Sequence, residues 1–405
     1  MSVLRRAARP TPSFVVTAAL LVVGVLPWPG RWGTSVRQAS RSSDLNRADH
    51  EAAAGGYYEG LVGVGAGGRG AGRNELALSL QGRPADWVGF QDSGVARPRA
   101  DDFLQFELRA DQDQLIFGRR FTTNALAMRD RAYAPRKPEG VFRVLLVGSS
   151  IDMGWGVGTD ETYENLLEDW LNSHAGRRGL ARRFEVWNGA VAAYGPAQRL
   201  EAYRRRAARC EPDLVIYSMT MLDPRLVEIH TCGLLQNRLD LRYGFLRDAV
   251  AAAGVTAEDL RRDVWGDLVR KEVIKRKLAP YRWSIAGAAL GALATDCRSN
   301  GRPLLALVVP RAGAADAPGA RAEAVARIAA LAREHGVPLV DLSGTFDDQD
   351  VEALEIAAWD DHPNARGHRL LFLALARALV QDRSFYHSFF GVEPPPGPLG
   401  ARGAP

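Results

Sequence analysis

Short apolar runs alternate with helical segments along residues 141–380. Runs of strand length lie at 141–147, 184–187, 213–217, 304–309 and 337–342. After the first run, apolar residues recur in steps of three, one, three and one, which places them on one helical face. They are Tyr163, Leu166, Leu167, Trp170 and Leu171. Strands that alternate with helices predict a flavodoxin-like, three-layer α/β/α domain with a doubly wound parallel sheet, over residues 141–385.

Further helices and one interruption complete this pattern. Helices are expected at 197–209, 321–335 and 365–380. Asp160 is expected to cap the helix after the first run, and Asn364 the last helix. Residues 225–300 break the alternation and predict a helical insertion. The Pro/Gly-rich tail, 386–405, is expected to be disordered from Glu393 onward.

The region before the domain, residues 76–140, has a β-like pattern. Apolar and polar residues alternate from Phe103 to Ala110, and a second strand-like stretch runs from Gln114 to Thr123. These features predict a small β-rich N-terminal extension.

The N-terminus combines a basic flank with an apolar stretch, the pattern of an export signal or membrane anchor. Three arginines precede residue 12, and the run that follows, to Gly30, is uncharged. It has neither an A-x-A cleavage site nor a lipid-anchor cysteine. We therefore expect an uncleaved signal anchor over 13–30, with residues 1–12 in the cytoplasm and the rest of the chain outside the cell membrane. A cleaved signal and a secreted product are the alternative.

Residues 31–75 are rich in Gly, Ala, Ser and Arg and predict a flexible linker. Gly63, Gly65 and Gly68 match G-x-G-x-x-G, but no strand precedes them and no helix follows, so we interpret them as a loop rather than a nucleotide site.

Charge and cysteine content exclude several classes of protein. The net charge is +5, and no basic stripe interleaved with aromatic residues is present, so nucleic acid is not expected as a partner. The three cysteines have no metal-like spacing and are too few for a disulfide scaffold. In an exported chain one disulfide is possible, with a pairing that the sequence does not specify.

Two polar clusters fall where the carboxyl ends of parallel strands carry function. Ser150 follows the first strand in a Gly-Ser-Ser turn, where a helix N-terminus would favour a nucleophile; a simple capping serine is the alternative. Near the last helix, Asp360 precedes His362 by two residues, a spacing that suits an oriented general base; a surface or capping histidine is the alternative. His362 and His368 are six residues apart and do not share a helix face, so neither a metal nor a cofactor is expected.

Three blocks, in order, resemble the SGNH, or GDSL-like, serine hydrolase superfamily over about residues 117–382. The first begins GSSIDMGWGVG, the second is VWNGAVAAYGPAQ, and the third is DDHPNARGHRLL. The stretch FTTNALAMRDRAYAPRKPEG also resembles the lead-in of a membrane-anchored or secreted bacterial subgroup. The resemblance implies Ser150 as nucleophile, His362 as base and Asp360 as acid. It further implies an oxyanion hole made by the backbone N–H groups of Ser150 and Gly189.

Two departures from the family pattern bear on activity. Leu222 stands where the family has the asparagine that completes the oxyanion hole, and leucine has no hydrogen-bond donor in its side chain. The acid lies two residues before the histidine instead of three. If Asp360 points away, either Asp361 or no acid at all serves in its place.

The sequence therefore supports an esterase that acts outside the cytoplasmic membrane, with O-acyl groups on a carbohydrate as a plausible substrate. Two alternatives stay open. The same site would serve an O-acyltransferase to a glycan, since no residue decides which acceptor enters. The Leu222 departure would instead suit a catalytically inactive, membrane-tethered binding or scaffold protein.

Overall fold

The computed structural model describes residues 88–394, apart from 265, 267, 313–318 and 358–359. The expected cytoplasmic segment, signal anchor and linker lie outside this range, as does the end of the tail. Within the described part of the chain, no helix is both long and apolar enough to cross a membrane.

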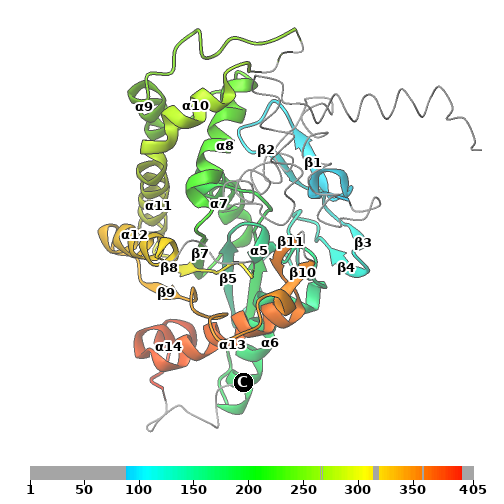
Figure 1. Ribbon diagram of the computed structural model, residues 1–405. Coiled ribbons are helices and arrows are strands. Elements are labelled where there is room, and N and C mark those ends of the chain that lie inside the picture. The colour runs from blue at the N-terminus through cyan, green and yellow to red at the C-terminus, as the bar shows by residue number, and fades with distance from the viewer. Residues whose placement is uncertain (1–87, 265, 267, 313–318, 358–359, 395–405) are drawn as a thin grey trace, which may run out of the picture. The chain divides into compact units, whose positions relative to one another are not determined.

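A five-stranded parallel sheet forms the centre of the domain (Figure 1). Its strands are β5 (Val141–Val147), β6 (Arg183–Asn188), β7 (Leu214–Met219), β8 (Leu304–Val308) and β9 (Leu339–Asp341). Their order is β6-β5-β7-β8-β9, and every neighbouring pair is parallel, which confirms the predicted flavodoxin-like sheet. The order reverses at β5, so the crevice for a ligand is expected at the carboxyl ends of β5 and β7.

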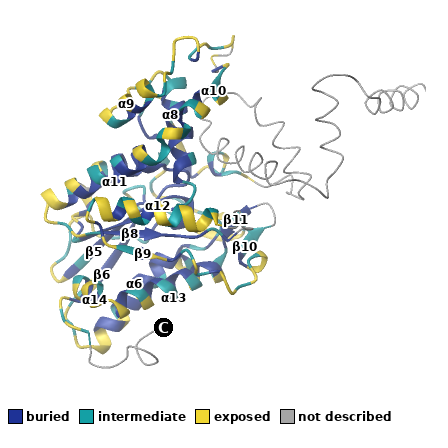
Figure 2. Ribbon diagram, turned by 60° about the vertical axis from the view of Figure 1, so that its left-hand side comes forward, coloured by how far each residue is buried: buried dark blue, intermediate teal, exposed yellow. Residues whose placement is uncertain are grey.

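Successive side chains of each strand point to opposite faces, and each face is covered by helices. Leu146 and Ile216 face a core shared with α6 (Tyr163–Arg177), α13 (Ala365–Gln381) and α14 (Arg383–Phe390). Leu145 and Tyr217 face a core shared with α7 (Pro196–Cys210), α11 (Arg282–Ser299) and α12 (Ala320–Glu334). Figures 1 and 2 show the two helical layers on either side of the buried sheet, so the three-layer prediction is confirmed.

Helix boundaries differ from the predictions at two places. Asp160 lies in a short 3-10 helix, Thr159–Glu161, and Thr162 is the N-cap of α6. Asn364 caps α13 as expected, because its side chain accepts hydrogen bonds from two backbone N–H groups of the first turn. α14 continues past residue 385 and buries Tyr386, Phe389 and Phe390, so the domain extends beyond the predicted boundary.

The region 225–300 is helical, as predicted, but only part of it is an insertion. α8 (Asp223–Gln236), α9 (Gly244–Ala252) and α10 (Lys271–Leu278) precede α11. Leu290 and Leu293 of α11 pack in the core of the sheet, so this helix belongs to the covering layer. Cys232 lies in a small separate core with Leu268 and Ile274, and all three cysteines of the chain are buried free thiols.

In its described residues, 88–140, the N-terminal extension forms two hairpins, which confirms its β-rich character. β1 (Ala96–Arg99) pairs with β2 (Gln105–Leu108), and β3 (Asp113–Ile116) with β4 (Arg119–Thr122). The second hairpin turns at Phe117 and Gly118, which both have positive φ angles of 51° and 72°, as a tight two-residue hairpin turn requires.

Side chains at the start of α7 and just before it hold the extension against the domain. The Tyr194 hydroxyl, before α7, donates to the Phe106 carbonyl at 2.6 Å. Gln198 donates to the Leu104 carbonyl at 2.8 Å. An apolar cluster that includes residues of the extension also contains Trp155, which lies shortly after β5. The extension is therefore part of the α/β domain.

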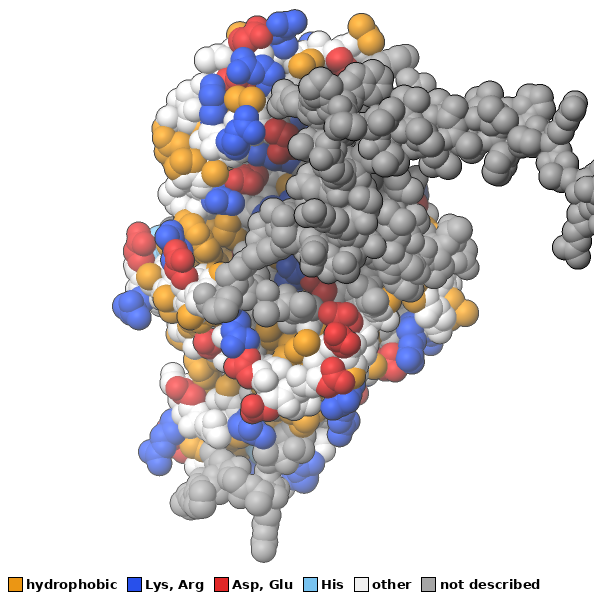
Figure 3. All heavy atoms as spheres, in the orientation of Figure 1, with side chains coloured by type: hydrophobic (Ala, Val, Ile, Leu, Met, Phe, Trp, Pro, Cys, Tyr) orange, Lys and Arg blue, Asp and Glu red, His pale blue; other side chains and the backbone are white. Residues whose placement is uncertain are grey.

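On the face seen in Figure 3, acidic and basic side chains of the described elements are interspersed.

Candidate active site

Ser150 begins α5 (Ser150–Met153), a four-residue helix that follows β5 at the predicted crevice. The turn is tight: a Cβ on Gly148 would lie 2.1 Å from Asp152 Oδ2, so this position requires glycine. The Asp152 carboxylate accepts the Ser149 N–H at 2.7 Å. As a first-turn residue, Ser150 has an N–H without an intrahelical acceptor. The turn therefore presents a serine and a backbone donor together, and Ser150 is 4% exposed.

Three side chains from distant segments hold this turn in place. The Tyr163 hydroxyl donates to Asp152 Oδ1 at 2.7 Å, and Asn188 Nδ2 donates to the Asp152 carbonyl at 2.8 Å. The buried Arg129 guanidinium donates to the carbonyl of Met153, the last residue of α5, and to that of Val157 in the following turn. Because α5 is too short to be rigid alone, these contacts fix the direction of the serine.

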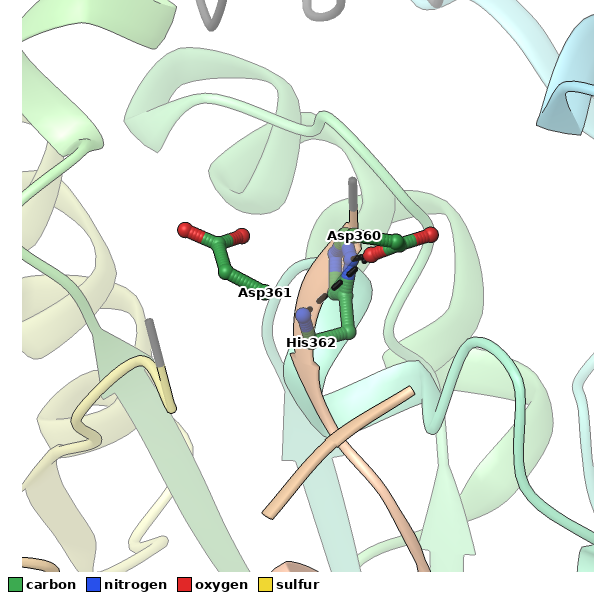
Figure 4. Close-up of side chains that lie close together, drawn as sticks. All are labelled: Asp360, Asp361 and His362. Carbon is green, nitrogen blue, oxygen red and sulfur yellow. Dashed lines mark hydrogen bonds and ion pairs between the residues drawn. The ribbon is translucent and has the colours of Figure 1, made fainter. Parts of the chain in front are cut away.

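The histidine and its acid lie on β11 (Asp360–Pro363), which pairs with β10 (Glu355–Ala357) as a separate hairpin. Asp360 and His362 are two residues apart on a strand, so their side chains point to the same side (Figure 4). Asp360 Oδ1 lies 2.5 Å from His362 Nδ1, and both residues are buried. A carboxylate at Nδ1 places the ring proton there and leaves the lone pair on Nε2.

This hairpin and the serine turn belong to one site, because α5 and β11 are in contact. The structure thus brings Ser150, His362 and Asp360 to the same end of the sheet, as the sequence predicts. Asp361, the alternative acid, points away from Asp360 and forms an ion pair with Arg311 (Figure 4). The acid partner of His362 is therefore Asp360.

The predicted oxyanion role of Gly189 does not hold in the structure. The Gly189 N–H donates to the Leu146 carbonyl at 2.8 Å and extends the pairing of β6 with β5. The turn that follows contains Ala193, which is buried and has a φ of 61°. A left-handed backbone at a non-glycine residue is uncommon and is concentrated at functional sites.

Leu222 supplies no side-chain donor at the N-cap of α8 and packs instead against the apolar cluster that contains Trp155. Nor does Thr220 replace the missing donor. Its hydroxyl lies 3.2 Å from Asp223 Oδ1, to which it donates, and accepts the Leu222 N–H.

A buried carboxyl cluster lies behind the turn and was not anticipated from the sequence. Asp130 accepts the Asn188 N–H at 2.7 Å, and Glu164 accepts from Asn188 Nδ2 at 2.8 Å. Burial raises the pKa of both carboxyls, and neighbouring carboxylates raise them further: Glu168 acts on Asp130, and Asp130 acts on Glu164. The Arg129-Asp130 pair of the family-like lead-in was the available signal, because Arg129 holds the segment after β5 and Asp130 binds the end of β6.

Three side chains at the site are close enough to be considered for a metal ion. One ligand atom each of Asp360, Asp361 and His362 lies within 4.8 Å of the others. The atoms are already engaged, however, because Asp360 binds His362 Nδ1 and Asp361 binds Arg311. This donor set fits an orienting carboxylate better than a metal centre, and we assign no metal to it.

His368 is a structural residue of the same neighbourhood. Its Nδ1 accepts the Tyr163 N–H at 3.1 Å, and the two rings stack. Burial, with smaller contributions from Arg129 and His362, lowers the pKa of His368 to about 3. His368 is therefore neutral in the folded protein and fixes the start of α6, whose Tyr163 holds the serine turn.

This neutral, buried histidine predicts a pH-dependent stability. Between about pH 6.5 and pH 3, the unfolded chain binds a proton at His368 that the folded chain does not. Folding stability contributed by this residue is thus present above pH 6.5 and falls as the pH decreases, by up to about 1.4 kcal/mol per pH unit. His368→Gln removes the titration. In urea unfolding from pH 7 to 4, the wild type is expected to lose stability more steeply than the variant; parallel curves would contradict this origin.

The fold and the site define a parallel α/β protein with a serine turn at the switch point and a histidine–aspartate strand beside it. The chain belongs to the GDSL-like lipase/acylhydrolase family, whose model matches residues 146–370, more than half of the chain. The family assignment establishes the hydrolase class in general terms.

Solved structures with a similar fold include several hydrolases. LAE5, an alpha/beta hydrolase enzyme from the metagenome of Lake Arreo, is 17% identical over 58% of this chain and 94% of its own, with a TM-score of 0.36. TesA is 17% identical, with 58% and 97% coverage and a TM-score of 0.37. Axe2, an acetylxylan esterase from Geobacillus stearothermophilus, is 15% identical, with 58% and 93% coverage and a TM-score of 0.36. No curated protein matches the sequence.

Proposed function

We propose that this protein is a serine-dependent esterase. Ser150 Oγ attacks the ester carbonyl, His362 accepts the hydroxyl proton at Nε2, and Asp360 keeps the imidazole in the required tautomer. The proton then passes from His362 to the departing alcohol, and water releases the acyl group from Ser150 by the same route. The observation that carries the proposal is the buried Asp360–His362 hydrogen bond of 2.5 Å, on a strand in contact with the helix that Ser150 begins.

The oxyanion of this reaction is held by backbone amides. Ser150 provides the first-turn N–H of α5. We assign the second donor to the turn after β6, at Ala193, in place of Gly189, whose N–H is used within the sheet. The third donor of the family pattern is absent at Leu222. Loss of one such donor typically costs about 10²–10³ in rate, so we expect a slow esterase or one with a narrow substrate range.

For substrate and location we propose an O-acyl group on a carbohydrate, outside the cytoplasmic membrane. Support for the location is the basic flank and uncharged run of residues 1–30. An O-acylated carbohydrate is a substrate that an esterase in this location would meet.

Release of acetate from acetylated oligosaccharides tests this function with the full-length chain in detergent. We expect release by the wild type and its loss in Ser150→Ala. Ser149→Ala is the matched control: its backbone N–H still reaches Asp152, so we expect most of the activity to remain. Acetate release by the wild type and by Ser149→Ala, but not by Ser150→Ala, supports the esterase. Transfer of the acetyl group to an added sugar in place of release would instead identify an acyltransferase.

Restoring the missing donor is expected to accelerate the reaction. Leu222→Asn places an amide where the family has one, on the N-cap of α8. A donor aimed at the oxyanion stabilises the transition state, so kcat is expected to rise at least about tenfold with little change in KM. Leu222→Val, which keeps an apolar side chain, is the control. An equal effect of both substitutions on kcat would contradict the role of the amide.

A further inference from the structure

The second carboxylate of the site, Asp361, is held by a residue from a different strand. Arg311, shortly after β8, forms an ion pair with the Asp361 carboxylate. The next residue, Ala312, donates its N–H to the Asp361 carbonyl at 3.2 Å. A side-chain contact and a backbone contact thus join β11 to the carboxyl end of the central sheet.

Asp361 is close enough to His362 for its charge to matter. An oxygen of Asp361 and a ring nitrogen of His362 lie within 4.8 Å of each other. At this separation a carboxylate shifts the titration of a partly desolvated neighbour by about 1–3 pH units, in favour of the protonated ring. An imidazolium is not a base, so an uncompensated Asp361 would reduce the fraction of active enzyme near neutral pH.

Besides Asp361 and Arg311, the titratable and charged groups near His362 are Asp360, Glu355, His368 and Arg129. Asp360 is on its own strand and binds Nδ1. Glu355 is on β10, and burial, with Glu352 and Asp360, raises the pKa of its carboxyl, while Arg311 lowers it. His368, on α13, is neutral, and the Arg129 guanidinium lies near it. Exchanges at Arg311 and Asp361 leave these groups in place.

We propose that Arg311 is a positioning residue that also balances charge: by pairing with Asp361 it holds β11 in place and offsets the negative charge that Asp361 would otherwise place near His362. This inference rests on the proposed function, because it concerns the base of that reaction. Arg311 acts through Asp361 and does not take part in the chemistry.

Two single variants and their combination separate the charge effect from a merely structural one. Arg311→Gln leaves the Asp361 charge uncompensated, and we expect the titration midpoint of the His362 ring to rise by about one pH unit or more. Asp361→Asn leaves Arg311 unpaired beside the ring, and we expect the midpoint to fall. In the double variant the two changes are expected to cancel to within about 0.3 pH unit. Arg311→Lys keeps the positive charge, so its titration midpoint is expected to remain close to that of the wild type.

The midpoints are measured by NMR on full-length chain with labelled histidine, and His362→Gln identifies the resonance. Both exchanged side chains are about one quarter exposed, 24% and 28%, so folding of the variants is expected and is checked by thermal melting. Opposite shifts in the two single variants support the proposal. Shifts in the same direction, or no shifts, would overturn it and leave the pair with a structural role alone.

The acid limb of the kcat/KM–pH profile is the second readout and is expected to move with the NMR midpoint. NMR does not require turnover, so the two proposals fail separately. Opposite NMR shifts in a chain without esterase activity would overturn the proposed function and support the charge balance. Normal esterase activity with unmoved midpoints would overturn the charge balance alone.

Discussion

Replacing His362 by alanine is expected to lower kcat/KM for an ester substrate by about 10⁴–10⁶, and replacing Asp360 by asparagine by about 10⁴. His362 is the group that takes the proton of Ser150, so no other side chain compensates for its loss. Asp360→Asn keeps the shape of the acid but places an amide beside Nδ1 of His362. The amide disfavours the tautomer in which the ring proton is on Nδ1. Both effects fall on kcat, because neither side chain is expected to hold the substrate in its ground state.

Asp361 provides the control for Asp360, because it is the next residue in the sequence and also carries a carboxylate. Asp361→Asn is expected to reduce kcat/KM by no more than about tenfold at pH 8, because Asp361 does not contact Nδ1 of His362. Steady-state kinetics with a chromogenic ester measure all three variants. A larger loss for Asp361→Asn than for Asp360→Asn would contradict the assignment of the acid.

Replacing Arg199 by methionine is expected to destabilise the fold by about 3–5 kcal/mol. Arg199 forms two hydrogen bonds of 2.7 Å with Asp223, and both side chains are completely buried. The same guanidinium donates to the Ser218 carbonyl at 2.9 Å, so it joins the end of β7 to the start of α8. Without Arg199 the Asp223 carboxylate would be left charged in a buried place, which is the main part of the cost.

Urea unfolding of variants checks this expectation against two controls. In Arg199→Met with Asp223→Leu no buried charge remains, and we expect a smaller loss than in the single variant. Arg327 forms an exposed ion pair with Glu323 on α12, with 52% and 67% of the two side chains accessible. Arg327→Met is therefore expected to cost less than about 1 kcal/mol. Equal losses at Arg199 and Arg327 would contradict the role of burial.

The architecture and the reacting residues were accessible to sequence analysis because they depend on local patterns. Apolar runs define strands, and the segment that follows the first strand places Ser150 at the carboxyl edge without any knowledge of the rest. The pair of Asp360 and His362 was also local. Its spacing of two brings the side chains together because the segment is a strand, where residues two apart share a side.

The parts that sequence analysis missed depend on contacts between segments far apart in the chain. Arg129 and Asn188 converge on the serine turn from the extension and from β6, and no local pattern shows that they meet. The Gly189 assignment was wrong because similarity to a family motif does not show where a backbone N–H donates. The length of an insertion is likewise not given by the sequence, because a helical pattern does not show that α11 packs in the core beside the sheet.

Reaction with a fluorophosphonate tests the central claim, an activated Ser150, most directly. The probe phosphonylates a serine only where a base and an oxyanion hole make it nucleophilic, so it reports the site independently of the natural acyl group. With full-length chain we predict one adduct, located at Ser150 by peptide mass spectrometry, that forms at least about a hundredfold more slowly in His362→Ala. A folded chain without an adduct, or an adduct on a residue other than Ser150, would contradict the account.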